Sequence, residues 1–174
     1  MLEVELRSFI TKEKHSELLD FFRKNSESLG EDAQITYYFD GPHDLRIQPS
    51  AKHSKVWLKK GKLHDEAREE IEVKCAKDDF PLLEKLFLAL GYSVSIKWFR
   101  NRHSFNWNGI TVTIDDTKGY GFIIELEKLC DETDKDAALA ELRAAFSKLC
   151  IQITPKEEFD KAFAHYKANW NTRV

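Results

Sequence analysis

The first residues of the chain alternate between apolar and charged side chains. In MLEVELRSF, the charged residues Glu3, Glu5 and Arg7 are separated by single apolar residues. Because successive side chains on a strand point to opposite faces, this pattern predicts a strand with one apolar and one charged face. A half-buried strand normally turns its charges to water. The first question is therefore whether this charged face meets solvent or an interior.

Comparable patterns continue along the chain and predict about eight strands and four helices. Besides the opening strand, strands are expected at 34–40, 44–48, 55–60, 68–75, 96–107, 110–116 and 122–129. Helices are expected at about 12–28, 79–92, 135–149 and 156–170. Strands that outnumber helices and follow one another through short turns are typical of an α+β protein with a largely antiparallel sheet.

The best-defined turn lies at Asn108-Gly109, between two of the expected strands. Both residues tolerate the positive φ of a type I′ hairpin, so these two residues are predicted to form the turn. The resulting register places Arg102 directly across from Asp115. One face of this hairpin is polar and the other apolar, and the polar face carries an arginine beside an acid.

Other expected strands show the same division between a charged and an apolar face. Glu125 and Glu127 share one face of their strand, and Glu70 and Glu72 share one face of theirs. Two architectures fit this pattern. The charged faces either meet water on an open sheet, or line the inside of a rolled sheet whose helices lie outside. An eight-stranded barrel encloses room for a small ligand, but buried charges there would need acids, bases, water, metal ions and a charged ligand to balance one another.

Composition narrows the class of protein. The chain has 174 residues, of which 42% are hydrophobic and 33% charged, which predicts one soluble globular domain over 1–174. Its net charge of −3 argues against a nucleic-acid-binding surface. No apolar run approaches the roughly 20 residues that span a bilayer, and the N-terminus does not look like a signal peptide, so a cytoplasmic location is expected.

The last expected helix carries an aromatic stripe on one side. Its members are Phe159, Phe163, Tyr166 and Trp170. Aromatic residues at helical spacing are usually buried against the rest of the protein. The stripe is therefore predicted to be core, with a homodimer contact as the alternative.

Six short motifs, in order along the chain, resemble those of the CYTH proteins, a family of triphosphate tunnel metalloenzymes. The opening E-V-E-L-R at 3–7 is similar to the family's E-x-E-x-K. The other five are D-L-R-I-Q (44–48), W-L-K-K-G (57–61), R-E-E-I-E (68–72), R-N-R-H-S-F (100–105), and I-D with G-Y-G-F-I-I-E-L-E (114–115 and 119–127). They resemble L-R-x-R, a lysine–glycine strand end, R-x-E-x-E, K-x-R-x-x-Y and L-D…G-L-G-x-F-x-E-x-E.

The resemblance implies an eight-stranded antiparallel β-barrel, with helices packed outside and charges facing a tunnel that binds a triphosphate-containing small molecule with Mg²⁺ or Mn²⁺. Hard carboxylate oxygens suit these cations, and arginine forks and lysine charges suit phosphates. The implied metal ligands are Glu3, Glu5, Asp115, Glu125 and Glu127. The implied substrate-binding residues are Arg7, Arg46, Lys60, Arg68, Arg100 and Arg102. Catalytic roles are implied for Glu3, Glu5 and Arg7, with Glu70 and Glu72 in support.

The sequence also departs from the family pattern. Arg7 replaces a lysine, Gln48 replaces the second arginine of L-R-x-R, and Phe105 replaces a tyrosine. An arginine stays charged, which disfavours proton transfer at position 7. The implied activity is metal-dependent hydrolysis of tripolyphosphate, thiamine triphosphate or a nucleoside triphosphate. The alternatives are a class IV-like adenylyl cyclase, which makes cyclic AMP and pyrophosphate, and a non-catalytic polyphosphate- or nucleotide-binding domain.

Overall fold

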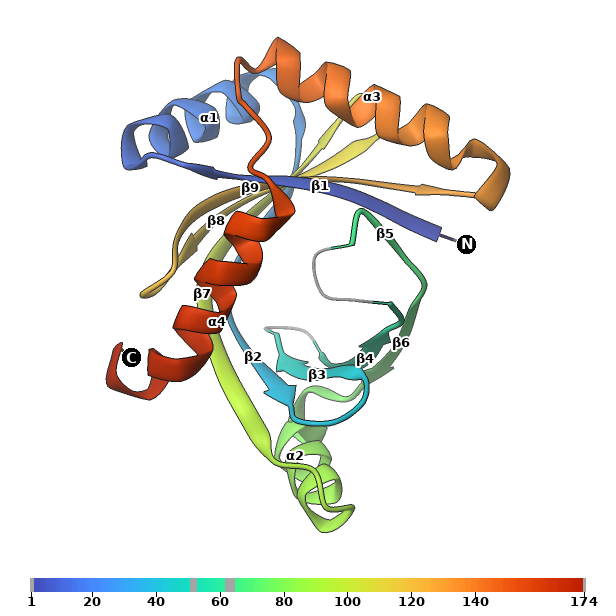
Figure 1. The fold of residues 1–174 in the computed structure, drawn as a ribbon, viewed down its shortest axis with the longest axis vertical. Helices are drawn as coiled ribbons and strands as arrows, with labels where there is room; N and C mark the ends of the chain where they lie inside the picture. Colours follow the sequence, from blue (N-terminus) through green and yellow to red (C-terminus); the bar gives the residue numbers. More distant parts are fainter. Residues whose placement is uncertain (1, 51–52, 62–64, 174) are drawn as a thin grey trace.

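The computed structural model describes residues 2–50, 53–61 and 65–173 and contains one antiparallel sheet with helices around it (Figure 1). The strands are β1 Leu2–Ile10, β2 Glu27–Phe39, β3 Asp44–Pro49, β4 Ser54–Lys59, β5 Ala67–Arg68, β6 Glu70–Cys75, β7 Val94–Trp107, β8 Ile110–Thr117 and β9 Gly121–Cys130. The helices are α1 Lys12–Asn25, α2 Phe80–Ala89, α3 Lys135–Lys148 and α4 Lys156–Arg173, with 3₁₀ turns at Lys77–Asp79 and Glu132–Asp134. No described helix is long and apolar enough to cross a bilayer.

The sheet rolls into a nearly closed barrel. Its strand order is β5-β1-β9-β8-β7-β2-β3-β4-β6, so the two strands at its ends, β5 and β6, are neighbours in the chain. Only Glu69 separates them. On one side Arg68 pairs with Glu3, and on the other Glu70 pairs with Lys59. The sequence prediction of an antiparallel barrel is confirmed, with nine strands instead of eight because the strand expected at 68–75 is divided at Glu69.

The pairing of β7 with β8 agrees with the predicted hairpin, whereas the first helix is shorter than predicted. Trp107 pairs with Ile110, and Arg102 pairs with Asp115, as the Asn108-Gly109 turn requires. The helix expected to reach residue 28 ends at Asn25. It ends there because β2 pairs with β7 from Glu27 onward, and backbone pairing in a long strand outweighs helix propensity at its last residues.

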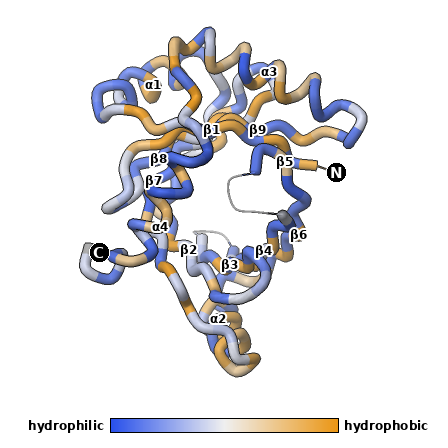
Figure 2. Tube along the Cα trace, in the orientation of Figure 1, coloured by the Kyte–Doolittle hydropathy of each residue, from blue (hydrophilic) through white to orange (hydrophobic). Residues whose placement is uncertain are grey.

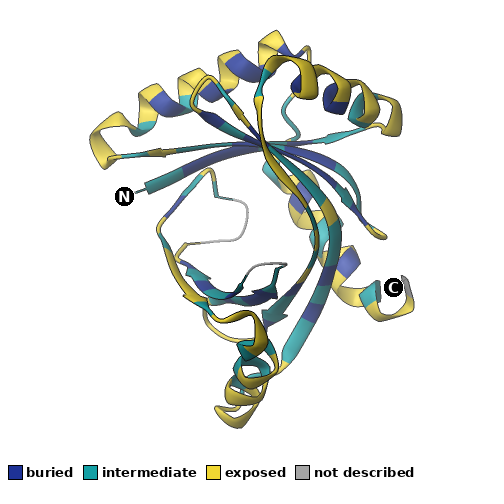
Figure 3. Cartoon of the chain, turned by 180° about the vertical axis from the view of Figure 1, so that it is seen from behind, coloured by how far each residue is buried: buried dark blue, intermediate teal, exposed yellow. Residues whose placement is uncertain are grey.

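Three helices cover the outside of the barrel. The inward sides of α1 and α3 are buried, whereas α2 is only partly buried (Figure 3). Helices α1 and α3 pack on β1, β8 and β9 through buried apolar residues such as Phe22 and Phe146. Helix α2 is hydrophobic along much of its length (Figure 2) and packs on β3 and β4 around Ile47. Each of these helices buries the apolar face of strands whose opposite face carries the charges.

Helix α4 lies across one mouth of the barrel instead of on its outer wall (Figure 1). Its residue Tyr166, 1% exposed, packs with Trp98, which lies on the same face of β7 as Arg100. The Tyr166 hydroxyl donates to the Lys97 carbonyl oxygen at 3.0 Å. The aromatic stripe is therefore core, as predicted, and Phe159 and Tyr166 are too deeply buried to form a homodimer contact.

Candidate functional site

The inner faces of the strands line one charged cavity. Its basic residues are Arg7, Arg46, Lys55, Lys59, Arg68, Arg100 and Arg102. Its acidic residues are Glu3, Glu5, Glu70, Asp115, Glu125 and Glu127. Tyr38, Trp57, Trp98, Tyr120, Phe159 and Phe163 give the same cavity an aromatic side. Glu3, Glu5 and Arg7 thus face an interior, which answers the question raised by the opening strand.

Strand periodicity explains how distant motifs meet there. Neighbouring strands share a face at paired positions, so one inward residue fixes its partners across the sheet. In the β1–β9 pair, Glu5 lies opposite Glu127 and Arg7 lies opposite Glu125. The predicted residues are brought together on this principle, with two exceptions: the cavity lining includes neither Lys60 nor Glu72.

The first ion cluster is centred on Arg102. Its guanidinium donates two hydrogen bonds to Asp115, at 2.8 and 2.6 Å, and a third to Glu125 at 2.5 Å. Arg100 also reaches Asp115, at 3.3 Å. Burial alone would raise the pKa of Glu125, but Arg102 and Arg7 hold it well below its ordinary value. Glu125 is therefore ionised at neutral pH.

The second ion cluster is centred on Lys59. Its ammonium lies 2.6 Å from Glu3, 3.0 Å from Glu70 and 3.7 Å from Glu5. Burial alone would lower the pKa of Lys59, but Glu5 and Glu3 raise it above its ordinary value of 10.5. Lys59 therefore remains a positive charge inside the cavity. Glu5 also forms an ion pair with Arg7.

The lysine implied by the motif resemblance, Lys60, lies outside the cavity lining, whereas its neighbour Lys59 is part of it. Lys60 pairs with Glu69 at 3.0 Å and its side chain is 55% exposed, whereas the side chain of Lys59 is 10% exposed. Adjacent residues of a strand point to opposite faces, so only one of the two lysines can face inward. Lys59 takes the inward position because it pairs with Asp44 and Glu70, whose side chains are also on the inner face.

A third cluster is formed by Asp44 and two of the predicted arginines. Asp44 itself was missed by sequence reasoning. Asp44 accepts two hydrogen bonds from Arg46, at 2.7 and 2.6 Å, and one from Arg68 at 2.8 Å. The Arg46 guanidinium lies over the ring of Tyr38, 4.4 Å from its centroid, and 5.8 Å from that of Trp57. The sequence signal that could have indicated this role of Asp44 is its spacing from Arg46, because residues two apart in a strand lie on the same face.

Lys55 is a further residue that sequence reasoning missed. It pairs across the strands with Gln48, which occupies the position of the missing arginine of L-R-x-R. Its ammonium lies 4.4 Å from the centroid of Trp57 and 2.9 Å from Glu72. Lys55 therefore supplies a positive charge beside the position where Gln48 removes one, and Glu72 contacts this lysine without lining the cavity.

Comparisons with known proteins agree with this geometry. The sequence model of the CYTH domain matches residues 1–157. The chain belongs to the CYTH family. A candidate adenylate cyclase of Methanocaldococcus jannaschii is 28% identical over 162 residues, covering 87% of this CYTH chain and 91% of the relative.

Solved structures share the fold of this CYTH chain. A conserved hypothetical protein of Pyrococcus furiosus has a TM-score of 0.78 at 23% identity, covering 88% of this chain and 96% of the other. A candidate adenylyl cyclase of Hippeastrum, described as having a dominant triphosphatase activity, has a TM-score of 0.62 at 18% identity, covering 90% of this chain and 93% of the other. These two structures show that the fold is shared across both chains.

Glu127 is the acid of this CYTH tunnel whose charge is least compensated. It lies opposite Glu5, and no salt bridge joins it to another described residue. Burial, with the nearby charges of Glu5 and Glu125, raises its pKa to about 8. The pKa of Glu3 is also raised, mainly by burial. The Glu5–Glu127 side of the cavity therefore favours an added positive charge.

The acids suit a divalent cation by their chemistry. Carboxylate oxygens are the ligands that Mg²⁺ takes from proteins, usually one or two beside substrate phosphates. Among the residues that the structure describes, no group of three or more acidic, histidine or cysteine side chains surrounds a metal position. Glu3 and Glu5 are engaged with Lys59 and Arg7. Carboxylate donors, and a raised pKa at Glu127 that a nearby positive charge would lower, fit a cation that binds together with an anionic substrate.

Proposed function

We propose that this CYTH chain hydrolyses a triphosphate-containing small molecule in its tunnel, with Mg²⁺ or Mn²⁺ as cofactor. The observation that carries the proposal is the convergence of arginines and lysines from most strands of the barrel on one cavity that also holds carboxylates. A polyphosphate chain carries several negative charges, and binding it requires more positive charge than one or two side chains provide. The acids keep these bases separated and charged before substrate binds.

The basic residues of the cavity are of two kinds: arginines, whose guanidinium groups can donate two parallel hydrogen bonds, and lysines, whose ammonium groups each supply a single positive charge. Arg46, Arg100 and Arg102 offer planar guanidinium groups that suit two phosphate oxygens at once. Asp44 fixes the orientation of Arg46, which reduces the entropy lost on binding. Lys59 and Lys55 add single ammonium charges. We assign Arg7 to phosphate binding and not to proton transfer, because Glu5 and Glu125 raise its pKa, despite burial, above its ordinary value.

The proposed metal ligands come from Glu3, Glu5, Asp115, Glu125 and Glu127, with Glu70 in support through Lys59. When bound, the cation would neutralise phosphate oxygens and orient the attacking water. The chain's own contribution is to hold the phosphates in line and to exclude bulk water from a buried site. Electrostatic positioning of this kind supplies most of the catalysis in phosphoryl transfer.

Adenylyl cyclisation is the main alternative, and it is favoured by the name of the Methanocaldococcus relative. In that reaction the 3′-hydroxyl of ATP attacks the α-phosphate and pyrophosphate leaves. The aromatic side of the cavity, which includes Tyr120 and Phe163, could stack on the organic end of either kind of substrate. A non-catalytic phosphate-binding domain is the third candidate.

A product assay separates these candidates. Purified protein with Mg²⁺ or Mn²⁺ is incubated with ATP, thiamine triphosphate or tripolyphosphate. Orthophosphate release supports hydrolysis and identifies the substrate, whereas cyclic AMP with pyrophosphate identifies a cyclase. Binding without turnover would favour the third candidate.

The Glu3→Gln/Glu5→Gln double variant is expected to lose at least about a hundredfold in kcat/KM, because it removes the negative charges that hold the cation and the basic side chains in place.

The neighbouring lysines offer a matched pair of variants. Lys59→Met is expected to lower kcat/KM by about tenfold to a thousandfold, since one charge-assisted phosphate contact is lost. Lys60→Met removes the same charge one residue away, on the exposed face, and is expected to leave kcat/KM within about twofold of wild type. Steady-state kinetics on both variants measures the difference. Equal losses at both positions would contradict the inward assignment of Lys59.

A further inference from the structure

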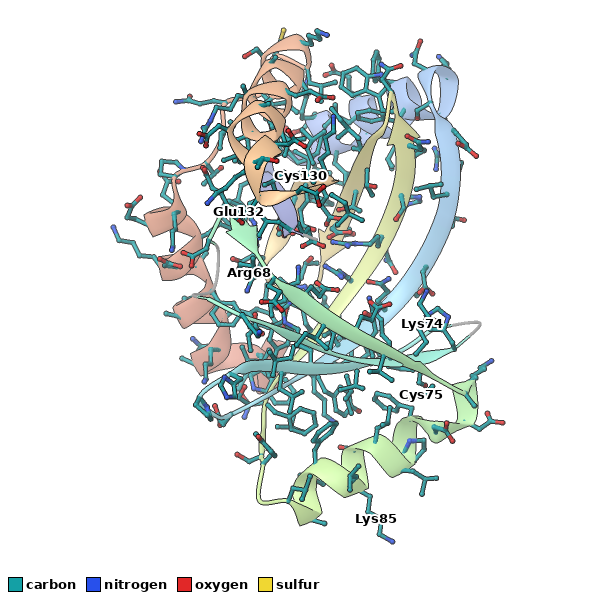
Figure 4. The ribbon with its side chains drawn as sticks, turned by 90° about the vertical axis from the view of Figure 1, so that its right-hand side faces the viewer. Arg68, Lys74, Cys75, Lys85, Cys130 and Glu132 are labelled. Carbon is teal, nitrogen blue, oxygen red and sulfur yellow. The ribbon has the colours of Figure 1, made fainter. Side chains whose placement is uncertain are left out.

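Strand β6 presents an open edge. It is the last strand in the sheet order and pairs with β4 on one side, so its other edge has no strand partner among the described residues. Figure 4 shows the chain running across the near face of the barrel from Arg68, at the end of β5, through β6 to Lys74 and Cys75. On its outer face, Ile71 is 49% exposed and Val73 is 54% exposed. Exposed, partly apolar edges of this kind readily pair with another strand.

The open edge carries backbone hydrogen-bonding groups at alternate residues. The Lys60 amide donates to the Glu69 carbonyl oxygen at 2.9 Å, which makes this pair a hydrogen-bonded one. Hydrogen-bonded pairs alternate along an antiparallel ladder. The backbone groups of Ile71 and Val73 therefore point to β4, and those of Glu72 and Lys74 point to the open edge.

The side chains of β6 favour pairing with an identical strand. In an antiparallel two-fold pair centred on Val73, Glu72 lies opposite Lys74 of the second copy, and this contact occurs twice. Val73 then lies opposite its own copy. Centring the pair on Glu72 would instead bring two identical negative charges together, which is unfavourable. In the single chain, the Lys74 side chain is 68% exposed, and its ammonium lies 4.0 Å from Glu72 Oε1. The Glu72 side chain is 28% exposed and contacts Lys55 through its other oxygen, Oε2, which leaves Oε1 to face Lys74 of a second copy.

We propose that β6 is a homodimer edge, paired antiparallel with β6 of a second copy in the register centred on Val73. A second copy is the occupant because the strand is complementary to itself in both charge and apolar contact, as a two-fold interface requires. This surface is distinct from the aromatic stripe of α4, which is used inside the chain. The proposal does not depend on the tunnel's activity, because it concerns the backbone edge of β6 and not its cavity-lining residue Glu70.

Sedimentation equilibrium without substrate tests the assembly. The wild-type chain is expected to form a dimer with increasing concentration. In either single variant, Glu72→Lys or Lys74→Glu, positions 72 and 74 that face each other across the interface carry the same charge, and this repulsion occurs twice. Each variant is therefore expected to weaken association by about tenfold or more. The double variant Glu72→Lys/Lys74→Glu restores opposite charges and is expected to recover the dimer. A wild-type monomer up to about 1 mM, or a double variant no better than the singles, would overturn the proposal.

Cysteine cross-linking tests the register. In a Cys75→Ser background, Val73→Cys places two thiols opposite each other in a non-hydrogen-bonded pair, where side chains approach most closely. Mild oxidation is expected to give a covalent dimer. Ile71→Cys in the same background faces position 75 of the second copy, which then carries no thiol, and is expected to give far less. Equal cross-linking at both positions, or more at position 71, would contradict the register.

Discussion

Replacing Arg102 with alanine is expected to abolish turnover and to lower the free energy of unfolding by about 3–5 kcal/mol. Arg102 donates to Asp115 and Glu125, whose side chains are 2% and 12% exposed. Removing the guanidinium leaves two nearly buried carboxylates without their closest counter-charge. The same change removes a planar phosphate ligand from the proposed site. Urea unfolding and kcat/KM on the same preparations measure the two losses.

Two further variants separate the stability effect from the effect on activity. Arg102→Ala/Asp115→Asn removes one of the stranded charges, so it is expected to recover at least about half of the lost stability while remaining inactive. Arg102→Lys keeps a charge but loses the fork and is expected to retain intermediate activity. An Arg102→Ala variant with wild-type kcat/KM would contradict a phosphate-binding role for this residue.

Most of the barrel could be predicted from side-chain alternation, but the direction of its charged face could not. The Asn108-Gly109 turn fixed the pairing of Arg102 with Asp115, and the structure confirms it. Whether that pair faces water or an interior depends on the two ends of the sheet meeting at Glu69. That closure joins β1 to residues more than sixty positions away, and local periodicity carries no information about such contacts.

The two lysines illustrate a different limit. The motif resemblance selected Lys60, the last lysine before Gly61, whereas the alternation of Trp57 and Lys59 on one face selects Lys59. A motif match can slip by one residue, and in a strand a slip of one residue reverses the face. Strand parity relative to Arg46 was the stronger criterion, because Trp57 pairs directly with Arg46.

Helix α4 could be predicted from the sequence, but its position at one mouth of the barrel could not. Its spacing predicts one buried side, and an amphipathic helix packs equally well on any apolar surface of sufficient size. The deciding residues are Trp98, Tyr38 and Tyr120, which give the inner face of the barrel an apolar region at one mouth. The positions of Tyr38 and Trp98 follow from the register of β2 and β7, whereas Tyr120 lies in the turn between β8 and β9. The three residues meet only once the sheet is assembled.

Glu127→Gln is expected to change how stability depends on pH. The pKa of Glu127 is raised from 4.5 to about 8, so between these values the folded chain holds a proton that the unfolded chain releases. Without divalent cations, the wild-type free energy of unfolding should therefore fall as pH rises from about 4.5 to 8, by on the order of 2–4 kcal/mol from this group. Glutamine does not ionise, so the variant should lack this part of the decrease.

Urea unfolding at pH 5, 7 and 9 in the presence of a chelator measures the difference, with Glu17→Gln as the control. Glu17 is 66% exposed and pairs only at the surface with Lys14, so its variant should follow the wild-type pH dependence. Wild type and Glu127→Gln should be closest in stability at pH 5 and furthest apart at pH 9. Parallel curves for the two proteins would contradict the raised pKa.

Adding Mg²⁺ to the same experiment tests the proposed cation site without requiring turnover. A cation that binds beside ionised Glu127 competes with its proton, so stabilisation by Mg²⁺ should increase from pH 5 to pH 9 in the wild type. Glu127→Gln keeps the side-chain volume but removes the charge, and it should gain less from Mg²⁺ at pH 9. Equal stabilisation of both proteins would place the cation away from Glu127, and the remaining acids on β1 and β8 would then become the candidate ligands.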